Sequence, residues 1–96
     1  MTRDPNGRLD AWLWHARFFK TRADAAAFVA DGRVRIARGG TVRRTDKPGC
    51  PVNPGDTLTF ARNGRLVSVT ILALAARRGS PEDAAALYQT AAGDAG

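Results

Sequence analysis

The stretch RLDAWLWHARFFKTRADAAAFVADG, residues 8–32, decides the fold, because two helical patterns follow each other with only a short break between them. At 100° per residue the first half places an apolar stripe on one side of a helix. The members of this stripe are Leu9, Trp12, Leu13, Ala16 and Phe19. A second apolar patch, on roughly the opposite side, contains Ala11, Trp14 and Phe18. This patch is either buried by another element, for example a C-terminal helix, or exposed for a partner.

The first helix is predicted to end near Lys20, where a second helix begins. Thr21 is the expected N-cap, and its spacing to Asp24 resembles a capping box. The second helix then runs to about Asp31, and Gly32 supplies the left-handed residue that commonly follows a helix end. A compact helix–turn–helix pair is therefore expected at the start of the chain.

After residue 32 the apolar period changes to two, which predicts strands. Val34 and Ile36 alternate with Arg33 and Arg35, so one side of this strand packs and the other is wet. Residues 41–46, TVRRTD, are expected to return as a second strand after a Gly-Gly break.

The clearest hairpin signal is Asn63-Gly64, the dipeptide favoured in type I′ turns. Pairing about this turn sets Phe60 opposite Val67 and keeps apolar residues on one face, with Thr and Ser on the other. The consistent faces indicate a single register for this hairpin.

A last helix is predicted from SPED at residues 80–83, with Ser80 as N-cap and Pro81 in the first turn. Leu87 and Tyr88 are its expected docking residues, and AAGDAG at residues 91–96 is small and polar enough to fray. Together the patterns predict an α+β fold. In it a helix–turn–helix pair packs on a small, mostly antiparallel sheet, and a C-terminal helix follows.

The charge of the chain is concentrated in one block. Residues 8–47 hold ten Lys or Arg against four Asp or Glu, and this accounts for the whole net charge of +6, because residues 48–96 carry four of each sign. A pI near 11.0 favours an anionic partner, either nucleic acid or a membrane surface. No apolar run approaches the length of a membrane span, and the first residues contain no signal-peptide core. A cytoplasmic nucleic-acid-binding protein is therefore expected.

Signatures of catalysis are nearly absent. The chain contains one His and one Cys, His15 and Cys50, which is too few for a zinc site of these residue types or for a supported Cys–His pair. Neither a Walker-type phosphate loop nor a dinucleotide fingerprint occurs. His15 is expected to be a surface or packing residue and Cys50 a turn residue, so no catalytic residue, metal or cofactor is predicted.

The candidate nucleic-acid site consists of basic residues around the helix joint and the first strands. Lys20 and Arg22 flank a helix N-terminus, whose free N–H groups favour an anion, and arginine forks hold phosphate in a bidentate way. The candidate set is Arg8, Arg17, Lys20, Thr21, Arg22, Arg33, Arg35, Arg38, Arg43, Arg44 and Lys47. The competing interpretation is a solvated face of unrelated charges.

The string RLDAWLWHARFFKTRADAAAFVADGRVRI, followed by KPGCPVNPGDTL, resembles the S-four type RNA-binding domain. The form RLDxWLWxARFxKTR is similar to the fifteen-kilodalton ribosome-associated heat-shock branch of that family, and RRGSPEDAAALY at residues 77–88 resembles the branch's C-terminal segment. The resemblance implies an alpha-L fold whose helix pair and adjoining hairpin form an L-shaped RNA-binding surface. On this surface it places Arg8, Arg17, Lys20, Thr21, Arg22, Arg33 and Arg35.

The same resemblance implies a function in stalled-ribosome rescue and the heat-shock response. The expected partner is ribosomal RNA of the free large ribosomal subunit that still carries peptidyl-tRNA after aborted translation. Residues 8–74 would form the RNA-binding domain and residues 75–96 a C-terminal helical segment with a frayed tail, in a monomer. The chain has Ala11 where relatives usually carry a basic residue. It also has a longer turn, VRIARGGTVRR, so the resemblance assigns no role to Arg38, Arg43 and Arg44.

Three other functions remain open at this point. A general DNA- or RNA-binding module would bind duplex DNA as well as RNA. An accessory part of an RNA-modifying enzyme, such as a pseudouridine synthase, would require a catalytic domain beyond residue 96. A protein-interaction module that used Trp14 and Phe18 would bind its partner largely independently of salt.

Overall fold

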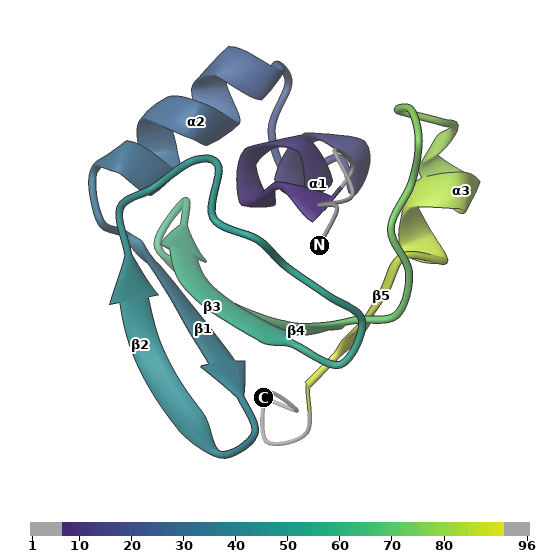
Figure 1. The fold of residues 1–96 in the computed structure, drawn as a ribbon. Helices are drawn as coiled ribbons and strands as arrows, with labels where there is room; N and C mark the ends of the chain where they lie inside the picture. Colours follow the sequence, from purple (N-terminus) through teal and green to yellow (C-terminus); the bar gives the residue numbers. More distant parts are fainter. Residues whose placement is uncertain (1–6, 92–96) are drawn as a thin grey trace.

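Residues 7–91 are described by a computed structural model, in which two helices are followed by four strands, a third helix and a fifth strand (Figure 1). The helices are α1 (Leu9–His15), α2 (Arg22–Ala30) and α3 (Pro81–Ala85). The strands are β1 (Val34–Arg38), β2 (Thr41–Thr45), β3 (Thr57–Arg62), β4 (Arg65–Ile71) and β5 (Tyr88–Thr90). The expected α+β class is confirmed. None of the helices described is long and apolar enough to cross a bilayer.

The five strands form one antiparallel sheet in the order β2-β1-β3-β4-β5. Figure 1 shows the helices on one side of this sheet. Burial alternates accordingly: Val34 and Ile36 on β1 and Leu58 and Phe60 on β3 are buried toward the helices, while Arg35 between them is exposed. The face of the sheet away from the helices is therefore not covered by any described helix.

The core lies between α1, α2 and the inner face of the sheet, and Trp12 is at its centre. Its side chain is fully buried, and the indole Nε1 donates a hydrogen bond of 3.0 Å to the carbonyl of Ala73. This bond matters because a buried indole N–H without an acceptor costs about 1–3 kcal/mol. The apolar stripe predicted for the first helix is confirmed, since all of its members are buried.

The hairpin between β3 and β4 has the register that its turn dipeptide predicts. Phe60 pairs with Val67 and Leu58 with Val69. Asn63 and Gly64 both have positive φ, 53° and 77°, as a type I′ turn requires.

The first helix is shorter than predicted, because α1 ends at His15 rather than near Lys20. Arg17 has φ of 67°, which turns the chain out of the helix. The amide of Phe18 then donates to the carbonyl of Leu13 at 3.1 Å, and the amide of Arg17 to that of Trp14 at 3.0 Å. This is the hydrogen-bond pattern of a Schellman motif. Because arginine stands where glycine is usual, the sequence gives no simple signal for this helix end.

The early end of α1 decides what covers its second apolar patch. Phe18 turns into the core, where its ring centroid lies 4.9 Å from that of Tyr88 and 5.5 Å from that of Phe60. Trp14 is half-buried under the guanidinium group of Arg78, 5.8 Å from the ring centroid. Of the two alternatives, burial is the one observed, but the cover comes from β5 and the segment before α3.

The C-terminal helix exists but is short. Ser80 and Asp83 form a capping box at its start, as SPED predicts. Tyr88 lies outside this helix, in the added strand β5, where it pairs with Ile71. The sequence did not predict this strand, because three residues are too few to show a period-two pattern. Of the expected frayed tail at residues 91–96, Ala91 donates a backbone hydrogen bond of 2.9 Å to the carbonyl of Ser68, and residues 92–96 lie outside the described residues.

Candidate nucleic-acid interface

All members of the candidate set are exposed, but they do not form one surface. Five of them surround the turn at residues 46–52, and we call this group the loop-side surface. Its members are Arg8, Arg22, Arg38, Arg43 and Lys47. The remaining members lie on other parts of the molecule.

The turn at residues 46–52 is held against the start of α1 by backbone hydrogen bonds. The amide of Leu9 donates to the carbonyl of Cys50 at 2.9 Å, and the amide of Asp10 donates to that of Pro48 at 3.0 Å. These two amides belong to the first turn of α1, where they have no partner inside the helix. The turn therefore satisfies the helix N-terminus and brings residues 47–50 beside Arg8.

Asp10 organises the part of the loop-side surface nearest the helices. Its carboxylate accepts hydrogen bonds from Arg8 Nε at 3.1 Å and Arg8 Nη2 at 3.0 Å, and Arg22 Nε lies 3.7 Å away. Asp10 itself is buried, whereas both arginine side chains are about half exposed. The buried carboxylate of Asp10 thus orients the two guanidinium groups, and their remaining N–H donors are available to solvent.

The protonation of this cluster follows from these contacts. Burial alone would raise the pKa of Asp10, but hydrogen bonds from Arg8 and the Ala11 amide, with the charges of Arg8 and Arg22, lower it below its ordinary value. The pKa of Arg8 is raised, mainly by its hydrogen bond to Asp10. Arg8 and Asp10 therefore both keep their charges at neutral pH.

A second buried carboxylate, Asp56, holds the opposite end of the loop-side surface. Arg38 donates to it from Nη2 at 2.7 Å and from Nε at 2.9 Å, and to the carbonyl of Pro51 at 3.2 Å. The backbone amide of Asn53 donates to the same carboxylate at 2.9 Å. The hydrogen bond to Asp56 is the largest cause of the raised pKa of Arg38.

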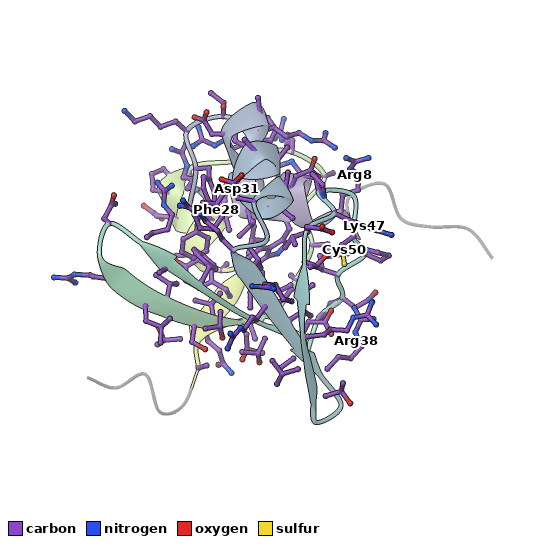
Figure 2. All side chains as sticks on the ribbon, turned by 90° about the vertical axis from the view of Figure 1, so that its left-hand side faces the viewer. Arg8, Phe28, Asp31, Arg38, Lys47 and Cys50 are labelled. Carbon is purple, nitrogen blue, oxygen red and sulfur yellow. The ribbon has the colours of Figure 1, made fainter. Side chains whose placement is uncertain are left out.

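A groove lies beside these two anchored arginines, with Gly49 next to Arg8 at one place and Pro51 next to Arg38 at another. Its lining residues are Arg43, Arg44, Thr45, Asp46, Lys47, Gly49, Cys50 and Pro51. Figure 2 shows Arg8, Lys47, Cys50 and Arg38 following one another along one side of the molecule. Arg43 and Lys47 form no ion pair within residues 7–91. An anionic chain lying in this groove would therefore meet three cations, Arg43, Arg44 and Lys47, against one acid, Asp46.

The other candidates lie outside this group, although Arg44 also lines the groove. Arg35 lies on the sheet face turned away from the helices, with Arg44 directly opposite it on β2. Arg33 lies 3.8 Å from Asp31 and over the ring of Phe28, and Figure 2 places both of these apart from the loop-side residues.

The three remaining members are Arg17, Lys20 and Thr21. Arg17 donates twice to the carbonyl of Gly79, at 2.9 and 3.1 Å, and so fastens the C-terminal segment. The hydroxyl of Thr21 accepts from the amide of Asp24 at 2.9 Å, which makes it the expected N-cap. Lys20 lines a shallow depression beside Asp24 and Arg62.

The sequence analysis missed the two acids that position the arginines, Asp10 and Asp56. The only available signal for Asp10 was its place two residues after Arg8. His15 is buried, as expected for a packing residue, and its Nδ1 has no hydrogen-bond partner among the described residues. Burial, and then the charge of Arg22, lowers the pKa of His15. Residues 7–91 contain no cluster of acids, His and Cys that could hold a metal ion.

Comparison with curated proteins finds similarity to heat shock protein 15 from several bacteria. Heat shock protein 15 of Escherichia coli K12 is 35% identical over 85 residues, which are 88% of this chain and 60% of the relative. The heat shock protein 15 homolog of Haemophilus influenzae is 39% identical over 83 residues, 85% of this chain and 59% of the relative. The chain thus spans about 60% of the length of these curated relatives. No family model matches the chain.

A solved structure of Vibrio cholerae heat shock protein 15 has the same fold, with a TM-score of 0.77 and 33% sequence identity. The match covers 88% of this chain and 81% of that one. That structure is described as trimeric, which contradicts the expectation of a monomer. Association depends on which side chains the folded surface exposes, and a pattern along the chain does not show this.

The curated sequences and the solved structure agree in identity, 33–39%, and each match covers 85% or more of this chain. The chain belongs to the heat shock protein 15 family.

Proposed function

We propose that this chain is a non-catalytic, cytoplasmic RNA-binding protein. Its target is structured ribosomal RNA on the free large ribosomal subunit that still carries peptidyl-tRNA after aborted translation. In this proposal the protein acts in rescue of the stalled subunit during heat shock and uses no cofactor. Residues 8–74 supply the RNA-binding surface, and the segment from residue 75 supports it.

The observation that carries the proposal is the loop-side surface with its two buried carboxylates. Exposed cations scattered on a surface need no fixed geometry, whereas Arg8 and Arg38 are each held by two hydrogen bonds to a buried acid. Fixed guanidinium forks are suited to phosphates in a set arrangement, as on a folded RNA, and selectivity then comes mainly from shape.

The direct test is co-sedimentation of the purified protein with separated small subunits, large subunits and whole ribosomes at two salt concentrations. Binding confined to free large subunits and weakened by salt is the expected result. Equal binding to every particle, or binding to none, would leave the family membership intact and remove the specific function.

A charge-reversal pair tests whether the loop-side surface is responsible. We expect Arg22→Glu combined with Lys47→Glu to abolish co-sedimentation. The matched control is Arg65→Glu combined with Arg77→Glu, which makes the same change of net charge at exposed residues outside the candidate set. Circular dichroism of both variants verifies that they are folded.

Duplex DNA distinguishes this proposal from general nucleic-acid binding. B-form and A-form helices differ in groove shape, so a surface fitted to folded RNA should prefer RNA at the same salt concentration. We expect duplex DNA to compete poorly for bound RNA. Equal competition would favour a general DNA- or RNA-binding module.

The trimeric state of the Vibrio cholerae relative gives a further expectation for this chain. We propose that it also self-associates, and light scattering across a concentration series tests this directly.

A further inference from the structure

The sheet face turned away from the helices has a row of side chains that the loop-side surface does not use. The register places Arg44 opposite Arg35, Arg35 opposite Thr59, and Thr59 opposite Ser68. These four residues, which we call the sheet-face row, lie on four adjacent strands. Strands are about 4.8 Å apart, so the row spans about 14 Å.

The two arginines of this row are placed unfavourably for an isolated protein. Like charges directly opposite each other on neighbouring strands destabilise a sheet. Within residues 7–91 neither Arg35 nor Arg44 forms an ion pair, although Asp31 and Asp46 line the depression beside Arg44. The outward positions of the five strands hold no acidic residue. An external anion would relieve this repulsion.

The hydroxyls beside the arginines retain hydrogen-bonding capacity. The Thr59 and Ser68 hydroxyl oxygens are 3.2 Å apart, and in the next row those of Thr57 and Thr70 are 3.1 Å apart. Each pair uses one O–H for its internal bond, which leaves a second O–H and spare lone pairs for a ligand. Cations beside hydroxyls match the phosphate and ribose groups of RNA, including the 2′-hydroxyl.

A protein partner fits this face less well. The exposed large apolar residues on its strands are Val42 and Leu66, while Leu72, also exposed, lies just beyond the end of β4. Val42 and Leu66 lie on opposite sides of the sheet-face row, three strands and about four residues apart, which is roughly 20 Å at the usual strand spacings. They therefore form no continuous apolar patch that would bury well against another protein.

From these contacts we infer that the sheet-face row is a second binding site for an RNA strand, on the sheet face turned away from the helices; Arg44, at one end of the row, also lines the groove of the loop-side surface. The inference rests on the proposed RNA-binding function and extends it. The described Cα atoms extend 33, 29 and 24 Å along the principal axes, so the two sites are close enough to hold two RNA segments of one folded particle together.

The experiment counts RNA molecules per protein chain. A short fluorescent RNA hairpin is titrated into the full chain, and native mass spectrometry gives the number bound. Three charge-matched double variants are compared: the sheet-face variant Arg35→Glu/Arg44→Glu, the loop-side variant Arg22→Glu/Lys47→Glu, and the control Arg65→Glu/Arg77→Glu. Thermal unfolding followed by circular dichroism verifies that each is folded.

We expect the wild type and the control to bind two hairpins per chain and each of the other variants to bind one. The wild type should also bring a donor-labelled and an acceptor-labelled hairpin into energy transfer, and the sheet-face variant should not. The sheet-face variant should lower the slope of log affinity against log salt by about 2, because two phosphates are then no longer neutralised by its arginines.

The ways in which the inference can fail are distinguishable. If the sheet-face variant still binds two hairpins, or the wild type binds only one, the second site is ruled out while the proposed function stands. If the loop-side variant also binds RNA like the wild type, the proposed function falls as well. If the sheet-face variant no longer self-associates and keeps its RNA stoichiometry, this face joins copies of the chain instead, which also overturns the inference.

Discussion

Two buried carboxylates explain why a surface suited to anions contains acids at all. Asp10 and Asp56 each lie under an arginine that is about half exposed, and each accepts two hydrogen bonds from it. Each acid cancels one charge, which weakens the long-range attraction for RNA. In return it fixes a guanidinium group that would otherwise lose about 0.5–1.5 kcal/mol of side-chain entropy on binding.

Replacing Asp10 therefore has two opposite effects on the affinity for RNA. Asp10→Asn makes the protein more positive, which by itself favours RNA, but it releases Arg8 and Arg22 from their shared partner. We expect geometry to outweigh charge and affinity for an RNA hairpin to fall by about fivefold, in line with the ordering cost of one or two side chains. Fluorescence anisotropy measures this. The control Asp24→Asn makes the same charge change at an exposed residue, and equal affinity of the two variants would contradict the prediction.

His15 gives a pH dependence to stability. Its pKa is lowered in the folded protein, by burial and then by the charge of Arg22, whereas the unfolded chain binds this proton near its ordinary pKa of about 6.5. The unfolded state thus binds more protons below about pH 7, and the free energy of unfolding should fall as pH decreases through that range. Urea unfolding at several pH values between about 5 and 8 measures the fall. In His15→Gln it should be smaller, and an identical decline in both proteins would exclude His15 as its cause.

At the scale of elements, the sequence predicts best where a local pattern is sufficient by itself. Asn63-Gly64 determines the hairpin register, and Ser80 marks the start of α3. The prediction fails where a tertiary contact decides. The end of α1 depends on Arg17 in a left-handed conformation, held by the carbonyl of Gly79 from the far end of the chain. Position 17 holds arginine rather than the glycine that usually ends a helix, so the sequence does not indicate this turn.

The segment between β2 and β3 has little regular structure, so its position should depend strongly on Asp56. This carboxylate joins Arg38 on β1 to the backbone of Asn53. We expect Asp56→Asn to lower the free energy of unfolding by about 2 kcal/mol, the typical value for removing charged hydrogen bonds at a partly exposed arginine. Asp46→Asn, an exposed change in the same segment, is the control. Chemical denaturation compares the two, and similar decreases in both would show that Asp56 does not anchor the segment.

For the whole molecule, the position of charge along the chain indicated the kind of partner but not the faces it would contact. All ten Lys and Arg of residues 8–47 belong to one sequence block, yet Arg22 and Arg35 lie on the helical layer and on the opposite sheet face. Alternation along β1 predicted that Arg35 points away from the core. Which other cations share its face depends on strand pairing, and no sequence period gives the partner of a strand.

The salt dependence of RNA binding is the property of the whole molecule that this arrangement predicts. If about five to seven phosphates are neutralised across the basic surfaces, log affinity should fall with log salt at a slope of roughly −4 to −6. Anisotropy titrations of a structured RNA between about 50 and 300 mM salt give this slope, and the variant Arg65→Glu/Arg77→Glu should keep it, because its substitutions lie outside both proposed sites. A slope shallower than about −2 would mean that few phosphates are contacted. Binding would then depend on aromatic and other uncharged contacts, as expected for a protein-interaction module at Trp14, and most of the arginines named above would be solvated surface charge.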